Sequence, residues 1–323
     1  MKRYLFILIG LISFILVGCS EGNTDGKPNK IRLDYATYSP ISLVLKEFGF
    51  LEEELKDEGI EIEWVFSQGS NKALEFLNSN SVDFGSAAGA ATLISKVNGA
   101  PIKNVYIFSK PEWTALVTLE DENIDLVADL KGKKIAATIG TDPYIFLLRA
   151  LNEQGIDPSE VEIVNLQHGD GATALTSGSV NAWAGLDPHM ARVELESSAQ
   201  LLYRNPDFNT YGFLNVREDF AKKYPGYVKR VIEAYEKARK WTLENPEKVA
   251  EILAEEAQID LEVAKLQLER NDFTESIPGN AHQKAIIEAG KILQQSEVID
   301  KTVNIQEIAT ELIDSSIAES TIK

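Results

Sequence analysis

The sequence predicts an α/β protein of two lobes, each a mixed, mostly parallel sheet flanked by helices, with a helical C-terminal third. Up to residue 216, short strand segments alternate with helical segments, which is the pattern of strand–helix–strand units. At residues 113–119 and 203–216, strand segments follow one another without a helix between them. After Arg217 the apolar residues follow helical spacing only. The two breaks in the alternation indicate two lobes.

The predicted strands are short apolar runs rich in β-branched and aromatic residues, bounded by glycine, proline or polar residues. They cover residues 31–35, 61–66, 82–85, 102–108, 114–119, 134–139, 160–166, 180–184, 199–204 and 211–216. The helices between them have apolar residues three and four positions apart, and they cover 41–57, 70–79, 89–97, 142–154, 170–177 and 187–195. In the last third, prolines at a first helical position mark 225–244 and 246–256, and further helices cover 260–270, 280–296 and 303–319.

The two breaks also predict the domain organisation. If the chain crosses between the lobes at both breaks, the first lobe is discontinuous in sequence. We expect lobe 1 to comprise residues 30–115 and 212–323, and lobe 2 to comprise residues 116–211. The C-terminal third would then complete the lobe that the N-terminal residues begin.

The first residues have the pattern of an export signal. Lys2 and Arg3 precede an apolar run that is too short to span a bilayer comfortably and is followed by polar residues. The letters LVGC, which end at Cys19, resemble the lipobox of bacterial lipoproteins, in which the cysteine receives a diacylglyceryl group. We therefore expect a lipoprotein signal peptide at 1–18, a flexible tether at 19–29 and a lipid anchor on Cys19. A plain secretory peptide with a chance cysteine is the alternative.

Composition and motif content exclude several classes of protein. The formal net charge of −18 repels phosphate backbones, so we expect no nucleic-acid partner. Cys19 is the single cysteine, which rules out an intrachain disulfide and a thiolate metal site. His168, His189 and His282 lack metal-ligand spacing, and no phosphate-cradling or dinucleotide-binding glycine motif occurs. We expect no metal, no cofactor and no enzymatic activity.

Small or polar residues follow six of the predicted strands and open the next helix, at 36–40, 67–71, 86–89, 140–143, 167–170 and 185–188. Ligands of open parallel sheets bind beyond the carboxyl ends of the strands, where helix N-termini offer free N–H groups to an anion. Asp142 and Asp187 each precede a proline, which fits an aspartate N-cap with proline as the first helical residue. We interpret Asp187 as a cap that can also touch a ligand, not as a catalytic acid.

Four blocks in a fixed order carry a resemblance to a known family. They are DFG at 83–85, ADLKGKKIA at 128–136, GT at 140–141 with LLRAL at 147–151, and SGSVNAW at 177–183 leading to Asp187. Together they resemble the solute-binding proteins of ABC importers, in the aliphatic sulfonate, taurine and nitrate group. The resemblance implies a type II periplasmic-binding-protein fold that closes on a small solute by hinge bending. It also implies a monomer on the extracytoplasmic face of the cell membrane, serving a permease that has a separate ATPase subunit.

The resemblance, carried over by position, implies a ligand site between the lobes. Its residues are Thr37, Tyr38, Ser39, Gln68, Gly69, Ser70, Ala88 and Gly89 from lobe 1, Gly140, Thr141, Asp142, His168, Asp170 and Asp187 from lobe 2, and Trp113 at the crossing. No arginine lies in these loops, and Lys110 is the one nearby cation. An anion would therefore depend on N–H groups and hydroxyls, whereas the three aspartates would oppose it or bind an amino group.

Two other functions stay open at this point. The same importer subunit could bind a thiamine-precursor pyrimidine or another aromatic heterocycle, sandwiched by Tyr38, Trp113 and Trp183. An enzyme on the same fold, such as a pyrimidine synthase or a menaquinone-pathway dehydratase, is the third reading. It has no activated nucleophile or metal cluster in the sequence to support it.

Overall fold

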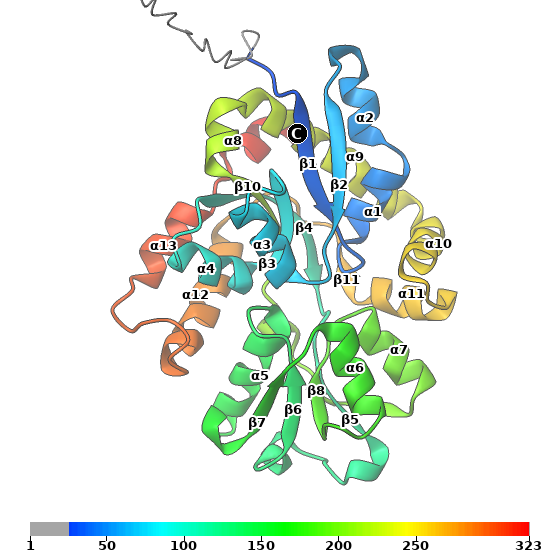
Figure 1. The fold of residues 1–323 in the computed structure, drawn as a ribbon, viewed down its shortest axis with the longest axis vertical. Helices are drawn as coiled ribbons and strands as arrows, with labels where there is room; N and C mark the ends of the chain where they lie inside the picture. The colour runs from blue at the N-terminus through cyan, green and yellow to red at the C-terminus, as the bar shows by residue number, and fades with distance from the viewer. Residues whose placement is uncertain (1–25, 323) are drawn as a thin grey trace, which may run out of the picture.

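The computed structural model describes residues 26–322, which form two lobes placed one above the other (Figure 1). Each lobe contains one mixed sheet flanked by helices, so the expected fold class is confirmed. The expected signal peptide, the lipid site at Cys19 and the tether before residue 26 lie outside the described residues. We call the lobes upper and lower, as they are drawn in Figure 1.

The upper sheet has six strands in the order β11-β4-β10-β3-β1-β2. Their bounds are β1 Lys30–Tyr35, β2 Glu61–Phe66, β3 Phe84–Ala88, β4 Ile102–Pro111, β10 Gly212–Arg217 and β11 Asn271–Asp272. Strand β1 pairs in parallel with β2 and β3, whereas β10 lies antiparallel between β3 and β4. Every residue of β3 is buried, because helices cover both faces of the sheet at its centre.

The lower sheet has five strands in the order β7-β6-β8-β5-β9. Their bounds are β5 Leu116–Leu119, β6 Lys134–Ala137, β7 Glu162–Asn165, β8 Ala182–Ala184 and β9 Ala199–Tyr203. Strand β6 is parallel to β7 and β8, and β5 is antiparallel to β8 and β9. Both sheets have a larger antiparallel share than the sequence predicted, because β5 and β10, which follow the two crossings, run against their neighbours. The lobe boundaries remain our proposal, and these strand positions support them.

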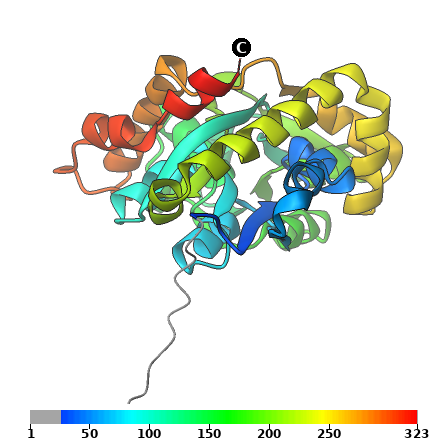
Figure 2. The same ribbon diagram turned by 90° about the horizontal axis from the view of Figure 1, so that it is seen from above.

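Helices pack around both sheets. In the upper lobe they are α1 Pro40–Glu47, α2 Phe50–Leu55, α3 Ser70–Asn78, α4 Gly89–Val97, α8 Glu218–Lys223, α9 Pro225–Glu244, α10 Pro246–Ala257, α11 Leu261–Glu269, α12 Asn280–Gln295, α13 Ile305–Leu312 and α14 Ser316–Thr321. In the lower lobe they are α5 Asp142–Glu153, α6 His168–Thr176 and α7 His189–Glu196. Seen from above, α10 and α11 lie at one end of the molecule and α12 and α13 at the other (Figure 2).

Two long helices of the prediction are each divided in two. The expected helix 41–57 breaks after α1, where Gly49 adopts a left-handed conformation with φ of +57°. The expected helix 303–319 breaks after α13, because Ile313 turns to an extended conformation and forms an isolated parallel bridge with Asn104 of β4. Helical spacing of apolar residues continues across both breaks, so the pattern alone did not show them.

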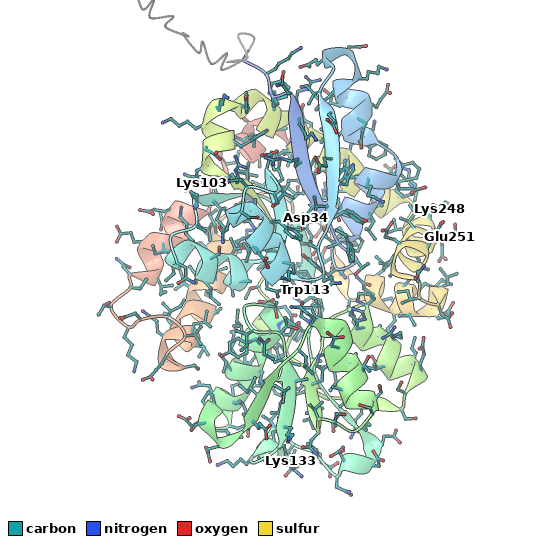
Figure 3. The ribbon with its side chains drawn as sticks, in the orientation of Figure 1. Asp34, Lys103, Trp113, Lys133, Lys248 and Glu251 are labelled. Carbon is teal, nitrogen blue, oxygen red and sulfur yellow. The ribbon has the colours of Figure 1, made fainter. Side chains whose placement is uncertain are left out.

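The chain passes between the lobes twice, after β4 and after β9. Trp113, in the first crossing, is 2% exposed and lies at the waist of the molecule (Figure 3). Within residues 26–322, no helix combines the length and the apolar character needed to cross a bilayer. The loops that follow β1 and β2 in the upper lobe and β7 and β8 in the lower lobe meet where the two lobes touch.

Candidate functional site

A cavity of about 260 Å³ lies where the two lobes meet. The upper lobe contributes the loops after β1 and β2 and the end of α10, and the lower lobe contributes the first turns of α6 and α7. Its lining includes four residues expected from the sequence, Thr37, Gln68, His168 and Asp170, and five that were not expected, Phe66, Gln167, His189, Arg192 and Glu256. The cavity is therefore shared between segments far apart in the sequence, as a solute site between lobes requires.

Two helix N-termini open onto this cavity. Helix α6 begins at His168, and the side chain of Gln167 before it makes no capping bond. Helix α7 begins at His189, which also lines the cavity. The first N–H groups of a helix lack partners within the helix and carry a partial positive charge. The Asp187 carboxylate already accepts the N–H of Ala191 in α7, so the end of α6 is the one suited to the oxygen atoms of an anion.

His168 presents an unpaired acceptor at the junction of the lobes. Its Nδ1 lies 3.1 Å from the Thr138 hydroxyl, whose own hydrogen is donated to the Leu166 carbonyl at 2.7 Å. Nδ1 therefore carries the ring hydrogen, and Nε2, which has no partner among the described residues, is an acceptor. Burial, and then the neighbouring His189, lowers the pKa of His168 to about 3, so the ring stays neutral.

Gly69 allows this imidazole to approach the upper lobe. A Cβ atom at position 69 would lie 2.8 Å from His168 Nε2, closer than real side chains come. The φ angle of Gly69 is 170°, an extended value that any residue adopts. The same Cβ would lie 2.9 Å from Asn71 Oδ1 of the upper lobe, so space between and within the lobes, not backbone conformation, favours glycine at this position.

Two arginines near the site were missed by the sequence analysis. Arg192 lines the cavity from α7, one turn beyond the loop that the analysis considered. Arg270 follows α11 in the upper lobe, is 9% exposed, and bonds to Asp187 and Glu194 of the lower lobe. Helical spacing from the 185–188 loop could have suggested Arg192. No local signal links Arg270 to the site, because it comes from the C-terminal third.

The carboxylate of Asp187 is already bonded to other groups of the protein. Its carboxylate lies 3.2 Å from Arg270 Nη1 and accepts the N–H of Ala191 in α7 at 2.8 Å. It thus caps the first turn of α7 as expected, although that helix begins at His189 and Pro188 takes the N-cap position. Burial raises the pKa of Asp187 to about 6, against the attraction of Arg270.

The capping role expected for Asp142 is wrong. Asp142 is the first residue of α5, and its carboxylate accepts hydrogen bonds from other segments. The donors are Trp113 Nε1 at 3.0 Å in the first crossing, and the N–H and hydroxyl of Thr210 at 2.9 and 2.6 Å in the second. One carboxylate therefore ties both crossings to the lower lobe, and burial raises its pKa.

The remaining expected residues are buried around the junction and do not line the cavity. They are Tyr38, Ser39, Gly69, Ser70, Ala88, Gly89, Trp113, Gly140, Thr141, Asp142 and Asp187, of which Gly140 is more open than the rest. At the start of α4, the N–H groups of Gly89 and Ala90 are already bonded to Thr210. That helix end is closed by the second crossing, and the N–H groups of Met190 and Ala191 in α7 are likewise bonded, so α6 offers the freer N-terminus.

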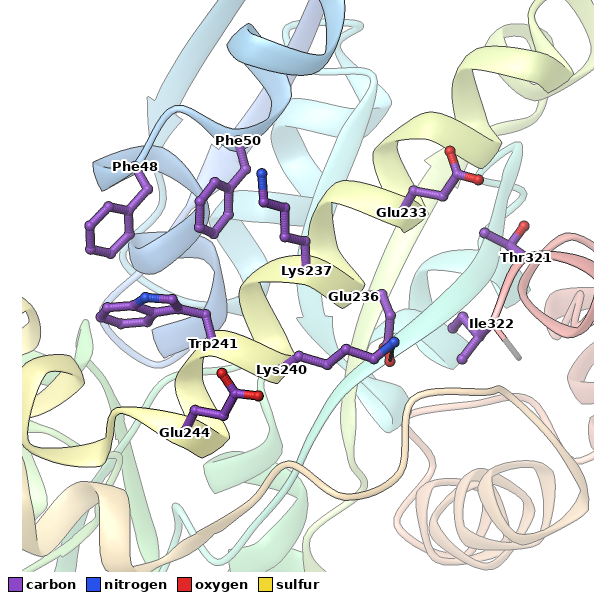
Figure 4. A pocket seen from close by; sticks show the side chains of 10 residues that line it. All are labelled: Phe48, Phe50, Glu233, Glu236, Lys237, Lys240, Trp241, Glu244, Thr321 and Ile322. Carbon is purple, nitrogen blue, oxygen red and sulfur yellow. Dashed lines mark ion pairs between the residues drawn. The ribbon is translucent and has the colours of Figure 1, made fainter.

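A larger cavity of about 650 Å³ lies on the outside of the upper lobe, between α2, α9 and the C-terminal residues (Figure 4). Its lining combines the rings of Phe48, Phe50 and Trp241 with lysines and glutamates of α9. The rings of Phe48 and Trp241 are in tilted contact, with centroids 4.5 Å apart and an interplanar angle of 52°. No residue of the lower lobe reaches this cavity, so we regard the smaller cavity between the lobes as the functional candidate.

Two lobes on mixed sheets, joined by two crossings over a shared cavity, define a protein with the periplasmic-binding-protein fold. The chain belongs to the NMT1/THI5 like family, whose sequence pattern matches residues 46–249.

Similar proteins agree with this assignment. A Bacillus subtilis (strain 168) protein named "Putative aliphatic sulfonates-binding protein" is 27% identical, over 95% of this chain and 94% of its own length. The crystal structure of the periplasmic aliphatic sulphonate binding protein SsuA from Escherichia coli is 26% identical, covers 87% of this chain and 92% of its own, and has a TM-score of 0.75. The alkanesulfonate-binding protein SsuA from Xanthomonas axonopodis pv. citri, bound to MOPS, has a TM-score of 0.81 at 23% identity, over 89% of this chain and 99% of its own.

Proposed function

We propose that the protein is the extracytoplasmic solute-binding subunit of an ABC importer and binds an aliphatic sulfonate or a taurine-like anion between its lobes. The observation that carries the proposal is the shared cavity, where the N-terminus of α6 and the Arg192 side chain provide positive potential. The names of the relatives point to the same class of solute. The bound solute is delivered to a membrane permease that works with a separate ATPase subunit.

The chemistry of the cavity fits a sulfonate. A sulfonate carries its charge at every pH used in solution, so it needs N–H donors and no proton from the site. Arg192 and the N-terminus of α6 supply such donors, whereas Asp170 on the cavity wall repels a second negative charge and attracts an ammonium group. A singly charged sulfonate, with or without an amino group, is therefore favoured over sulfate.

The test is calorimetry and thermal unfolding with ethanesulfonate, taurine, sulfate, propionate and a hydroxymethylpyrimidine. We expect the two sulfonates to bind, and a ligand at about 100 times its Kd to add about 2.7 kcal/mol to the free energy of unfolding. Arg192→Gln should weaken sulfonate binding about tenfold or more, because it removes a charged donor. Arg230→Gln, at ion pairs with Glu54 and Glu58 on the outside of the upper lobe, is the matched control and should bind normally.

The same experiment separates the other functions. Stabilisation by the pyrimidine alone would replace the sulfonate assignment with the heterocycle. We also propose that the protein has no enzymatic activity. Chemical turnover of any of these compounds by the purified chain would contradict that part of the proposal. A monomeric state and a lipid anchor on Cys19, which would hold the protein at the membrane, are proposed with it.

A further inference from the structure

Asp34 is a fully buried carboxyl in the penultimate position of β1, behind the loops that face the cavity (Figure 3). Its Oδ1 accepts the backbone N–H of Ser86 in β3 at 2.7 Å. Its Oδ2 lies 2.6 Å from the hydroxyl of Ser67, which follows β2. The Ser67 hydroxyl lies 3.2 Å from the hydroxyl of Tyr38, which in turn donates to the Ser86 carbonyl at 2.9 Å. One carboxyl thus begins a chain of hydrogen bonds that joins the ends of β1 and β2 to the middle of β3.

A count of hydrogens shows which form of Asp34 this chain requires. Three contacts need a hydrogen each: Asp34 with Ser67, Ser67 with Tyr38, and Tyr38 with the Ser86 carbonyl. The two hydroxyls supply two hydrogens. If Asp34 is ionised, these two hydrogens serve only two of the three contacts, and the third contact is left without a hydrogen. With a protonated Asp34, the carboxyl donates to Ser67, Ser67 donates to Tyr38, and Tyr38 donates to the carbonyl.

The surroundings of Asp34 contain no compensating cation. The titratable groups that face it are phenols: Tyr38 from the loop after β1 and Tyr235 from α9. The neighbouring strands β2 and β3 contribute Ser67 and Ser86, and no ion pair to Asp34 occurs within residues 26–322. Desolvation by burial raises the pKa of Asp34 to about 7, against the hydrogen bonds from Ser67 and Ser86, which lower it.

We propose that Asp34 is held protonated and acts as the positioning residue that fixes the solute-facing loops of the upper lobe. It fixes Tyr38 in the loop after β1 and Ser67 next to Gln68 and Gly69, and it anchors both to Ser86 in the middle of β3. The inference rests on the proposed function only insofar as these loops bind the solute. When Asp34 ionises, the contact between Ser67 and Tyr38 loses its hydrogen, and the loops after β1 and β2 separate more easily.

The test compares the wild-type chain with Asp34→Asn, whose amide places an N–H where the protonated carboxyl has its O–H. The probe is ethanesulfonate, which does not titrate, measured by calorimetry from pH 6.5 to 8.5. If only the protonated form binds, the wild-type Kd should rise about twentyfold over this range. The Asp34→Asn protein should fold, bind, and show a nearly constant Kd. The low pKa values of His168 and His189 keep both rings neutral throughout.

Asp83→Asn is the matched control, because Asp83 is also a buried carboxyl of the upper lobe but is paired with Arg32 and Arg217. It should lower stability and keep the wild-type pH dependence of binding. Equal pH dependence in the wild type and Asp34→Asn would overturn the proposal.

A second readout does not depend on any solute. Amide hydrogen exchange, corrected for its intrinsic pH dependence, should show protection of residues 36–39 and 67–69 falling above pH 7 in the wild type and unchanged in Asp34→Asn. If ethanesulfonate fails to bind but protection follows this pattern, the proposed solute is wrong and the role of Asp34 stands. If protection is the same in both proteins, the role of Asp34 is wrong, whatever binds.

Discussion

At the scale of single residues, the junction of the lobes depends on Gly69. His168 is fixed from behind by Thr138, and its Nε2 edge fills the space that a side chain at position 69 would need. Close approach of the two lobes therefore requires that one of the facing residues has no side chain. Gly69 was expected to bind the solute, and the geometry gives it the further role of a contact between lobes.

We expect Gly69→Ala to hold the lobes apart. The added methyl group would lie 2.8 Å from His168 Nε2, so the imidazole or the whole lower lobe must move. Overpacking of this kind costs about 1–3 kcal/mol, which corresponds to roughly a ten- to hundredfold loss of sulfonate affinity. Calorimetry measures the loss, and small-angle scattering measures the accompanying increase in radius of gyration.

Gly226→Ala is the control for this substitution. A Cβ at Gly226, in the first turn of α9, meets nothing within 4 Å and lies in a helix, where alanine is favoured. This variant should bind and scatter as the wild type does. If Gly69→Ala leaves the radius of gyration and the sulfonate affinity unchanged, the His168 side chain can move aside without a measurable loss of free energy, and the prediction is wrong.

The sequence predicted the candidate site only where its residues follow strand ends. Thr37, Gln68, His168 and Asp170 were found because loops at the carboxyl ends of neighbouring strands meet at one edge. Arg270 and Asp34 could not be found in this way. Arg270 reaches the junction through the fold of the C-terminal third, and the role of Asp34 depends on hydroxyl positions that no spacing in the sequence encodes.

At the scale of secondary-structure elements, the lobes are held together on one side by α7 and the end of α11. Arg270 extends from the upper lobe to Asp187 and Glu194, which flank the first turns of α7. A buried charge of this kind is stable only while its partners are in place, since its removal leaves an uncompensated carboxylate behind. The ion pair therefore favours the arrangement in which the lobes touch.

Arg270→Met should loosen this arrangement. Breaking a buried ion pair from one side costs about 3–5 kcal/mol, and part of that cost is avoided if the lobes separate and hydrate Asp187. We expect a larger radius of gyration without solute and a lower unfolding temperature. Lys248→Met, at an exposed pair with Glu251 on α10 (Figure 3), should change neither quantity measurably. If Arg270→Met has the radius of gyration of the wild type, the ion pair stabilises the fold but does not hold the lobes together.

The elements themselves were predicted well where their signal is local. Strands β1, β2 and β9 and helices α9 and α10 match within about one residue, because their alternation or spacing and their prolines are strong. The short strand β11 was missed, since two residues carry no periodicity and pair with β4 only through the tertiary fold. The order of strands within each sheet was not predicted, because the residue pattern of one strand does not indicate which strands pair with it.

At the scale of the whole molecule, a single carboxylate joins the two crossings. Asp142 in the lower lobe accepts hydrogen bonds from Trp113 and Thr210, which lie in different crossings. Thr210 also receives the N–H of Ala90 at the start of α4 in the upper lobe. The region about which the lobes would rotate is therefore a bonded unit, and movement must be taken up by the residues on either side of it.

Asp142→Ala should damage this unit. It leaves three buried donors without their acceptor, and we expect the free energy of unfolding to fall by about 2–4 kcal/mol in urea titrations. Asp142→Asn retains one oxygen for Trp113 and the Thr210 N–H, so it should cost less than half as much. Equal losses for the two substitutions would mean that charge, rather than hydrogen bonding, is what matters at this position.

The central place of β10 in the upper sheet affects how the chain acquires its shape during synthesis. Residues 30–111 contribute strands β1 to β4, yet β3 and β4 do not pair with each other and meet only through β10, at residues 212–217. The upper sheet cannot form in full until the ribosome has made these later residues, so the upper lobe of a nascent chain stays unfolded for most of its translation. In the extracytoplasmic role proposed above, such a delay leaves time for the chain to be threaded through a membrane while it is still unfolded.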